Sequence, residues 1–188
     1  LDFDIGIWET TETHPIGKTF ENHAYKAPTT TTSAGEIRGA LEEAGLHHVM
    51  LNEYDDVACK TLKKNRPEWN VIEGDIHNID FSIYQGKVDV VTGGFPCQAF
   101  SYAGKKLGFE DARGTLFFEW ARAVKEIKPK ICVGENVRGL LSHDNGKTIK
   151  GMIDVLTELG YKVLNPQVLK AIYYKVPQKR ERMILVGI

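Results

Sequence analysis

Cysteine is scarce in this chain, and its scarcity excludes two classes of protein. The 188 residues include three cysteines, Cys59, Cys97 and Cys132, which are widely spaced and form no Cys-x-x-Cys pair. An odd number of separated cysteines disfavours both a disulfide framework and a structural zinc site, and it favours a reducing compartment. We therefore expect a cytoplasmic protein that binds no metal.

Long apolar runs and a strong net charge are also missing. No apolar stretch approaches the roughly 18 residues of a membrane span, and no signal peptide opens the chain. We therefore expect a soluble protein without a membrane partner. The formal net charge is −1, which neither indicates nor excludes nucleic acid, because a local basic patch matters more than the sum. Hydrophobic residues make up 42% of the chain, which is enough for one sizeable core.

Helical and strand-like patterns alternate from residue 36 onward. The apolar spacing predicts helices over 36–44, 56–65, 116–128 and 148–159. It predicts strands over 49–51, 71–72, 88–91, 131–133, 161–169 and 183–188. This alternation indicates an α/β fold with a largely parallel sheet and helices on both faces. Phe117 and Trp120 lie on one predicted helical stripe, which we expect to face the core.

Residues 1–35 do not share this rhythm. They contain several threonines and scattered aromatic residues without a clear period. We therefore expect an irregular N-terminal arm of unclear role. Residues 36–188 are expected to form the domain that carries the function.

A Pro-Cys pair at the end of a predicted strand is the most informative local feature. The run VDVVT at 88–92 leads directly into GGFPCQAFS at 93–101. Chemistry in parallel sheets is usually placed on loops at this end of the strands. Pro96 restricts its own φ and favours an extended Phe95, so the Cys97 side chain is held in one direction. An isolated cysteine is more often a buried structural thiol, so further motifs must decide between these interpretations.

Four more segments follow in order. They are GFEDARGTLFFE at 108–119, ENVRG at 135–139, SHDNGKT at 142–148 and PQKRER at 177–182. Together with GFPCQAFS at 94–101, their order and spacing resemble those of bacterial cytosine-5 DNA methyltransferases. The resemblance covers roughly residues 36–188. It implies a Rossmann-like, S-adenosylmethionine-dependent fold and DNA methylation of the kind found in restriction-modification systems.

The resemblance assigns the catalytic residues. Carbon-5 of cytosine is a poor nucleophile, so a thiolate first adds to carbon-6 to make it one. Cys97 corresponds to this nucleophile, and Glu135, placed just past a predicted strand, corresponds to the acid at ring nitrogen 3. Arg182 corresponds to an arginine that contacts the base, and Arg180 to one that supports the site. Taken alone, the last two would more often be part of a solvated charge run.

The resemblance also implies a cofactor site for S-adenosylmethionine. An acid at the end of the second strand of a doubly wound sheet can accept hydrogen bonds from ribose hydroxyls, and Glu53 fits this role. Seven further residues match the remaining cofactor positions of the family, namely Gly35, Tyr54, Asp75, Ile76, Gly94, Pro96 and Leu116. Ser33 and Glu36 replace two glycines of the glycine-rich turn, where Gly35 remains. The alternative for Glu53 and Asp75 is that they are ordinary loop and cap acids.

Double-stranded DNA is the partner that the resemblance implies. A stacked cytosine cannot be enclosed, so the base must be flipped out of the helix. Residues 98–108 form a basic segment with glycines at 104 and 108 as hinges, which could close over DNA. The predicted DNA contacts are Gln98, Ser101, Lys105 and Arg113.

The chain departs from the family pattern after its arginine motif. Nothing in it resembles the family's target-recognition region or its last two motifs, so we expect a fragment or one subunit of a split enzyme. A second polypeptide would then carry the recognition region. Two alternatives remain open at this stage: a non-catalytic, methyltransferase-like scaffold, and the same chemistry on an RNA cytosine.

Overall fold

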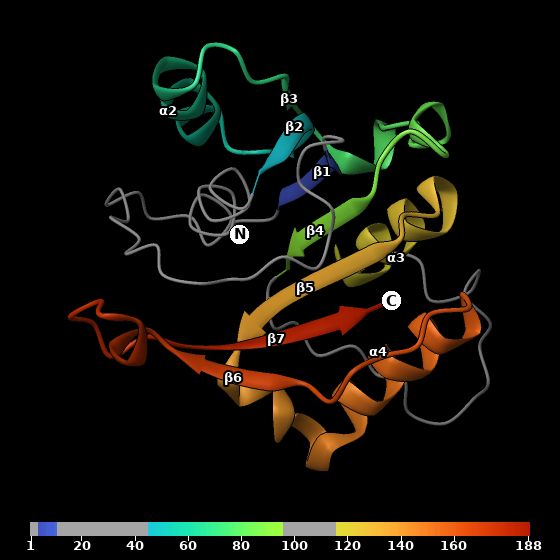
Figure 1. The fold of residues 1–188 in the computed structure, drawn as a ribbon, viewed down its shortest axis with the longest axis vertical. Helices are drawn as coiled ribbons and strands as arrows, with labels where there is room; N and C mark the ends of the chain where they lie inside the picture. The colour runs from blue at the N-terminus through green and yellow to red at the C-terminus, as the bar shows by residue number, and fades with distance from the viewer. Residues whose placement is uncertain (1–3, 11–44, 96–115) are drawn as a thin grey trace.

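The computed structural model describes residues 4–10, 45–95 and 116–188 (Figure 1). Their strands are β1 (Asp4–Thr10), β2 (Leu46–Glu53), β3 (Val71–Glu73), β4 (Val90–Gly94), β5 (Ile131–Val137), β6 (Gln167–Lys170) and β7 (Glu181–Gly187). The α-helices are α2 (Asp56–Asn65), α3 (Leu116–Ile127) and α4 (Lys147–Glu158). Short 3₁₀ turns are η1 (Ile76–Asn78), η2 (Ser82–Tyr84), η3 (Arg138–Leu141), η4 (His143–Gly146) and η5 (Ala171–Tyr174).

One seven-stranded sheet organises these elements, in the order β3-β2-β1-β4-β5-β7-β6. β2 pairs with β3 in parallel and β4 pairs with β5 in parallel, whereas β1 and β7 run antiparallel to both of their neighbours. Five strands, β2 to β6, therefore point in one direction and two point in the other. The predicted α/β fold with a largely parallel sheet is confirmed, with the two reversed strands as an addition.

The prediction of an irregular N-terminal arm is wrong for Asp4–Thr10. These residues form β1 in the middle of the sheet, where Gly6 pairs with Leu51 of β2 and with Thr92 of β4. Ile5 and Ile7 are fully buried. Two isoleucines around a glycine give too short a pattern to identify a strand from the sequence, and the pairing partners lie far away in the chain. The remainder of the predicted arm, 11–35, lies outside the described residues.

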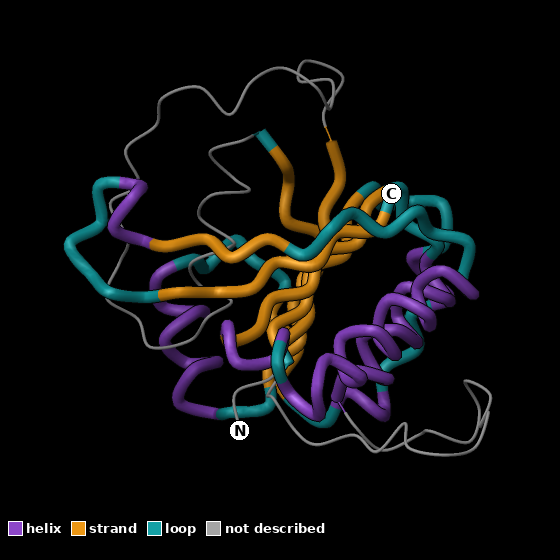
Figure 2. Tube along the Cα trace, turned by 90° about the horizontal axis from the view of Figure 1, so that it is seen from below, coloured by secondary structure: helices purple, strands orange, loops and turns teal. Residues whose placement is uncertain are grey.

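Helices cover both faces of the sheet, as predicted (Figure 2). Successive side chains of a strand point to opposite faces, and Met50 belongs to the core cluster under α3 and α4, whereas Leu51 packs with Cys59 of α2. Trp120 is fully buried at the centre of the larger cluster, which confirms its predicted core role. A Cβ atom on Gly93 would lie 2.4 Å from Trp120 Cδ1, so β4 needs glycine beneath the indole.

The predicted boundaries are accurate for helices and too short for three strands, among them β2, which was predicted over 49–51 and spans Leu46–Glu53. α2 matches the prediction at both ends, and α3 and α4 differ from it by one residue at one or both ends. β5 continues beyond 133 and includes Glu135, and β7 begins at Glu181 and includes Arg182, so both predicted site residues lie within strands and not beside them. The strand predicted over 161–169 is limited to β6. The helix predicted over 36–44 lies outside the described residues.

Candidate active site

The ends of four adjacent strands form one row of paired residues. Glu53 at the end of β2 pairs with Asp4 of β1, which pairs with Gly94 at the end of β4, and Gly94 pairs with Glu135 of β5. Neighbouring strands lie about 4.8 Å apart, so the backbones at Glu53 and Glu135 are about 14 Å apart. Both predicted half-sites therefore lie at the carboxyl edge of the parallel strands, where open α/β sheets bind ligands.

Glu135 and Arg182 form the central ion pair of this edge. Arg182 Nε lies 2.7 Å from Glu135 Oε1, and the Glu135 side chain is only 8% exposed. Arg182 Nη1 also donates to the backbone carbonyl of Glu181 at 3.0 Å, which holds the guanidinium along β7. The antiparallel pairing of β5 with β7 brings the two side chains together although 47 positions separate them. A buried carboxylate with one oxygen fixed by a guanidinium is well placed to hold a hydrogen-bonding base edge.

Asn136 is a site residue that the sequence reasoning did not identify. Its side chain is buried, and Nδ2 donates to the backbone carbonyl of Phe95 at 2.7 Å while Oδ1 accepts from the Val137 N–H at 2.8 Å. Asn136 thereby fixes the end of β4 immediately before Pro96 and Cys97. Its place beside Glu135 in the ENVRG motif was the available signal.

A second set of ion pairs fixes the start of β7. Glu181 accepts from Arg138 Nη1 at 2.8 Å and pairs with Lys170 Nζ at 2.9 Å. Hydrogen bonds from Lys170 and Arg138 hold the pKa of the Glu181 carboxyl below its usual value. Arg180 is half-buried, and its carbonyl accepts from the Ala171 N–H at 2.9 Å. These contacts tie β6, β7 and η3 together around the arginine motif.

Glu53 and Tyr54, both predicted to bind the cofactor, have contrasting environments. Glu53 is buried, and its Oε1 accepts from the backbone N–H groups of Tyr54 at 2.8 Å and Asp55 at 3.0 Å. The carboxylate is therefore held against its own turn. Tyr54 is mostly exposed, so its ring is available for stacking.

Asp75 and Ile76 begin the turn η1, which follows β3. Asp75 Oδ1 accepts from the His77 N–H at 3.0 Å and contacts His77 Nδ1 at 2.6 Å, and these hydrogen bonds hold the pKa of Asp75 below its usual value. The Asp75 carboxylate is half-exposed. Ile76, in contrast, is buried in the main core. The predicted acid is therefore accessible, and the predicted apolar partner faces the interior.

Arg122 of α3 holds this turn by hydrogen bonds to its backbone. Its Nη2 donates to the Ile76 carbonyl at 2.8 Å, its Nη1 donates to the Ile79 carbonyl at 2.9 Å, and its Nε donates to Glu119 Oε2 at 2.8 Å. His77 Nε2 lies 3.8 Å from Glu119 Oε1, which closes the network on the outer side. Sequence reasoning missed this clamp, because an Arg three residues after a Glu is also the usual pattern of a solvated helix face.

The remaining predicted residues divide into two groups. Gly94 is buried at the end of β4, and Leu116 is the first residue of α3 and packs against the core. The others lie outside the described residues, namely Gly35, Pro96, Cys97, Gln98, Ser101, Lys105 and Arg113. No group of three potential metal ligands occurs in the described ranges.

The other two cysteines are unsuited to nucleophilic chemistry. Cys59 and Cys132 are buried free thiols. Burial raises the pKa of Cys59 to about 11 and that of Cys132 to about 12. The thiolate is the reactive form, so both remain protonated and inert near neutral pH.

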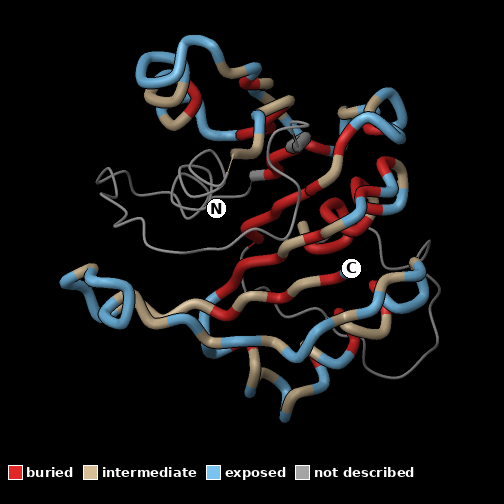
Figure 3. Tube along the Cα trace, in the orientation of Figure 1, coloured by how far each residue is buried: buried red, intermediate tan, exposed pale blue. Residues whose placement is uncertain are grey.

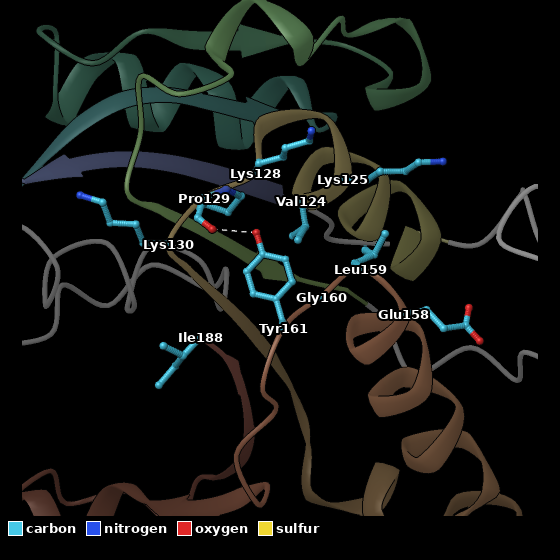
Figure 4. A pocket seen from close by; sticks show the side chains of 10 residues that line it. All are labelled: Val124, Lys125, Lys128, Pro129, Lys130, Glu158, Leu159, Gly160, Tyr161 and Ile188. Atoms are coloured by element: carbon cyan, nitrogen blue, oxygen red, sulfur yellow. Dashed lines mark hydrogen bonds between the residues drawn. The ribbon is translucent and has the colours of Figure 1, made fainter.

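A hollow of about 470 Å³ lies at the opposite edge of the sheet (Figure 4). It is formed around Tyr161, whose hydroxyl donates to the Pro129 carbonyl at 2.7 Å. Figure 4 shows the side chains of Lys125, Lys128 and Lys130 turned away from the tyrosine ring. Since no charged groups converge in this hollow, it does not compete with the Glu135–Arg182 edge as the candidate site.

Comparison with known proteins agrees with this geometry. Residues 30–188 match the family model described as C-5 cytosine-specific DNA methylase. The chain belongs to this family. It is 61% identical over 167 residues to the Type II methyltransferase M.Eco47II of Escherichia coli, covering 89% of this chain and 40% of that protein. Type II methyltransferase M.PspPI of Psychrobacter sp. (strain TA137) is 62% identical over 155 residues, covering 82% of this chain and 37% of that protein.

The fold of this methylase family member is also found among solved structures. A mutant of DNMT2 from Spodoptera frugiperda is 26% identical, with a TM-score of 0.63, covering 81% of this chain and 46% of that one. The methylase chain spans about two fifths of the length of the curated relatives that it matches. In its described part, no helix is long and apolar enough to cross a membrane.

Proposed function

We propose that this chain is the catalytic part of a DNA (cytosine-5-)-methyltransferase, which transfers a methyl group from S-adenosylmethionine to carbon-5 of a flipped cytosine in double-stranded DNA. The observation that carries the proposal is the buried Glu135–Arg182 pair at 2.7 Å, in the same row as Gly94. Cys97 follows two peptide units after Phe95, a reach of about 7 Å at most. Because Gly94 pairs with Glu135 across β4 and β5, this short chain connection supports a Cys97 thiol within reach of the candidate acid.

The chain's own residues then divide the chemistry between them. The Cys97 thiolate forms a bond to carbon-6 of the cytosine, and the electron pair displaced from the ring double bond makes carbon-5 nucleophilic. Glu135 faces ring nitrogen 3 and stabilises the proton held there as the ring gains negative charge. Arg182 fixes one oxygen of Glu135, and Asn136 fixes the backbone of the nucleophile's segment. After methylation, loss of the carbon-5 proton and of the thiolate restores the aromatic ring.

S-Adenosylmethionine fits the groups at the β2–β3 half of the row. Asp75 presents a half-exposed carboxylate whose Oδ1 is already oriented by His77, and Tyr54 presents an exposed ring for an adenine. Glu53 would face the ribose, with its carboxylate oriented by two backbone N–H groups. When bound, the cofactor supplies the electrophilic methyl group.

A mechanism-based trap tests the proposal. Duplex DNA containing 5-fluorocytosine cannot lose a proton from carbon-5, so a covalent protein–DNA adduct should accumulate in the presence of cofactor and any complementing polypeptide. Cys97→Ser should abolish the adduct, Glu135→Gln should slow its formation by about 100-fold, and Cys132→Ser should leave it unchanged. An adduct mapped to Cys59 or Cys132, or one formed with RNA and not with DNA, would contradict the proposal. No adduct with any substrate would favour a non-catalytic scaffold.

We further propose that recognition of the DNA sequence resides outside these 188 residues, on a second polypeptide or on a longer form of the chain. The support is that the chain spans 40% and 37% of the two relatives compared above, both named Type II methyltransferases. The basic groups placed in this chain suit phosphates and a flipped base, which carry little sequence information.

A further inference from the structure

The β6–β7 hairpin projects beyond the Glu135–Arg182 pair. Its tip, defined here as residues 171–180, joins β6 to β7 and stands out from the body at the carboxyl edge (Figure 1). Most of the tip is exposed (Figure 3). Ile172, Tyr173 and Tyr174 are 56%, 75% and 58% exposed. Three consecutive large side chains in water mark a surface that meets a partner.

All charged residues of this tip are basic. The chain has no acidic residue between Glu158 and Glu181, and the basic residues in that interval are Lys162, Lys170, Lys175, Lys179 and Arg180. Lys170 is paired with Glu181 and Arg180 is half-buried, so Lys175 and Lys179 are the exposed charges of the tip itself. A basic surface interleaved with exposed aromatic rings is complementary to nucleic acid, which offers phosphates and base or sugar faces.

Lys175 has an unfavourable backbone conformation. It follows η5 with φ 62° and ψ 18°, in the left-handed region that favours glycine. Its side chain is exposed, so packing does not compensate for the strain. The strain lies where the exposed tyrosines and the basic charges of the tip meet, and this coincidence supports a role for the Lys175 side chain.

The tip is also anchored relative to the candidate active site. Arg182 pairs with Val137 of β5 on one side and with Leu169 of β6 on the other. Glu181, one residue earlier, is held by both Arg138 and Lys170. The tip therefore cannot move far without disturbing Arg182.

We propose that the hairpin tip is a DNA-contact surface that binds the phosphate backbone beside the target cytosine, with Lys175 on a phosphate and Tyr173 and Tyr174 against the neighbouring sugars or bases. This inference rests on the proposed function, because it takes the Glu135–Arg182 edge as the place where the cytosine enters. We commit to a polyanion as the partner because every charged residue of the tip is basic, and a protein partner is the alternative that the test below distinguishes.

The chain provides a matched control for Lys175. Lys128 is another exposed lysine with a positive φ, 54°, and it lies at the opposite edge of the sheet beside the Tyr161 hollow. Replacing either lysine by glycine removes one positive charge and relieves the same type of backbone strain. Both Lys175→Gly and Lys128→Gly should therefore raise the melting temperature, and only Lys175→Gly should weaken DNA binding.

The measurement is the affinity of the full 188-residue chain for a fluorescent, unmodified duplex, as a function of salt and without cofactor. The slope of log K against log salt is negative, and one lost phosphate contact makes it less steep by about 0.9. The same loss lowers the affinity about eight-fold at 0.1 M salt. Lys175→Arg should bind like the wild type. Tyr173→Ala should weaken binding without changing the slope, since stacking releases no counterions.

Equal affinities and slopes for the Lys175→Gly and Lys128→Gly variants would overturn the proposal. So would a Tyr173→Ala variant that binds DNA normally but loses self-association in sedimentation experiments, because the tip would then be a protein–protein surface. The assay involves no chemistry, so its outcome is separate from that of the covalent trap. If the covalent adduct forms but Lys175→Gly leaves the salt slope unaltered, only the proposal for the tip is refuted. If Lys175→Gly changes the slope but no adduct forms, only the catalytic proposal is refuted.

Discussion

Arg122 offers the sharpest test of how the cofactor-side turn is held. Arg122→Met removes the hydrogen bonds to the Ile76 and Ile79 carbonyls and leaves Glu119 without its guanidinium. The Glu119 side chain is 7% exposed and that of Arg122 is 23% exposed. Breaking a buried pair by removing one partner costs about 3–5 kcal/mol. Partial exposure of Arg122 favours the lower end, so we expect a loss of about 3 kcal/mol in the free energy of unfolding.

Two companion variants separate the contributions. Arg122→Lys keeps the charge near Glu119 but lacks the planar fork that reaches two carbonyls, so it should lose about 1–2 kcal/mol. Adding Glu119→Gln to Arg122→Met removes the stranded charge and should recover about 1–2 kcal/mol. Lys60→Met provides a control for an exposed pair: Lys60 Nζ lies 2.9 Å from Asp56 Oδ2 on α2, with both side chains more than half exposed. Its loss should cost at most about 1 kcal/mol.

Urea denaturation of the whole chain, with the midpoint and slope compared between variants, measures these differences. The reasoning fails if Arg122→Met lowers the free energy of unfolding no more than Lys60→Met does. It also fails if the loss in the Arg122→Met/Glu119→Gln double variant equals the sum of the losses caused by Arg122→Met and Glu119→Gln separately. Because Asp75 caps η1, the same Arg122→Met variant should also bind S-adenosylmethionine more weakly, which calorimetry on the folded fraction would detect.

Two further predictions concern the core. Gly93→Ala places a methyl group 2.4 Å from Trp120 Cδ1 and should cost about 2–3 kcal/mol in thermal unfolding, whereas Gly139→Ala, with no atom within 4 Å of the new methyl group, should change stability little. The pKa values of Cys59 and Cys132 are raised from 9.0 to about 11 and about 12, so alkylation of these thiols in the native chain should stay slow from pH 8 to 10. The unfolded chain loses those protons near pH 9, so stability should fall above that pH, by about 1 kcal/mol per thiol at pH 10. Rapid native-state labelling at pH 9 would refute the burial argument.

The sequence predicted best what depends on neighbouring residues. α2 matched at both ends because its signals are local: Asp55 caps it by accepting from the Ala58 N–H at 2.7 Å, and Pro67 closes it. β5 and β7 were predicted too short because their site ends are polar. Glu135, Asn136 and Arg182 interrupt the apolar pattern, yet the ladder between the strands continues through them. A functional site placed inside a strand removes the hydrophobic signal by which the strand is identified.

What the sequence could not predict depends on distant pairing. β1 takes its place from partners about 45 and 85 positions away, and nothing within Asp4–Thr10 identifies them. Likewise, the bond between Asn136 and the Phe95 carbonyl joins segments 41 residues apart. The resemblance to a family supplied Glu135 and Arg182, and the fold supplied the contacts that hold them.

The position of β1 has a mechanical consequence. Within the described sheet, β2 and β3 are hydrogen-bonded to β4 and the strands beyond it only through this one seven-residue strand. Glu53 and Asp75 lie on one side of β1, and Glu135 and Arg182 lie on the other. The relative placement of these two sides therefore depends on the pairing of β1 with β2 and with β4. Under the proposed function, a change that strengthens or loosens this strand would alter the alignment between methyl donor and acceptor without touching a residue proposed to contact either.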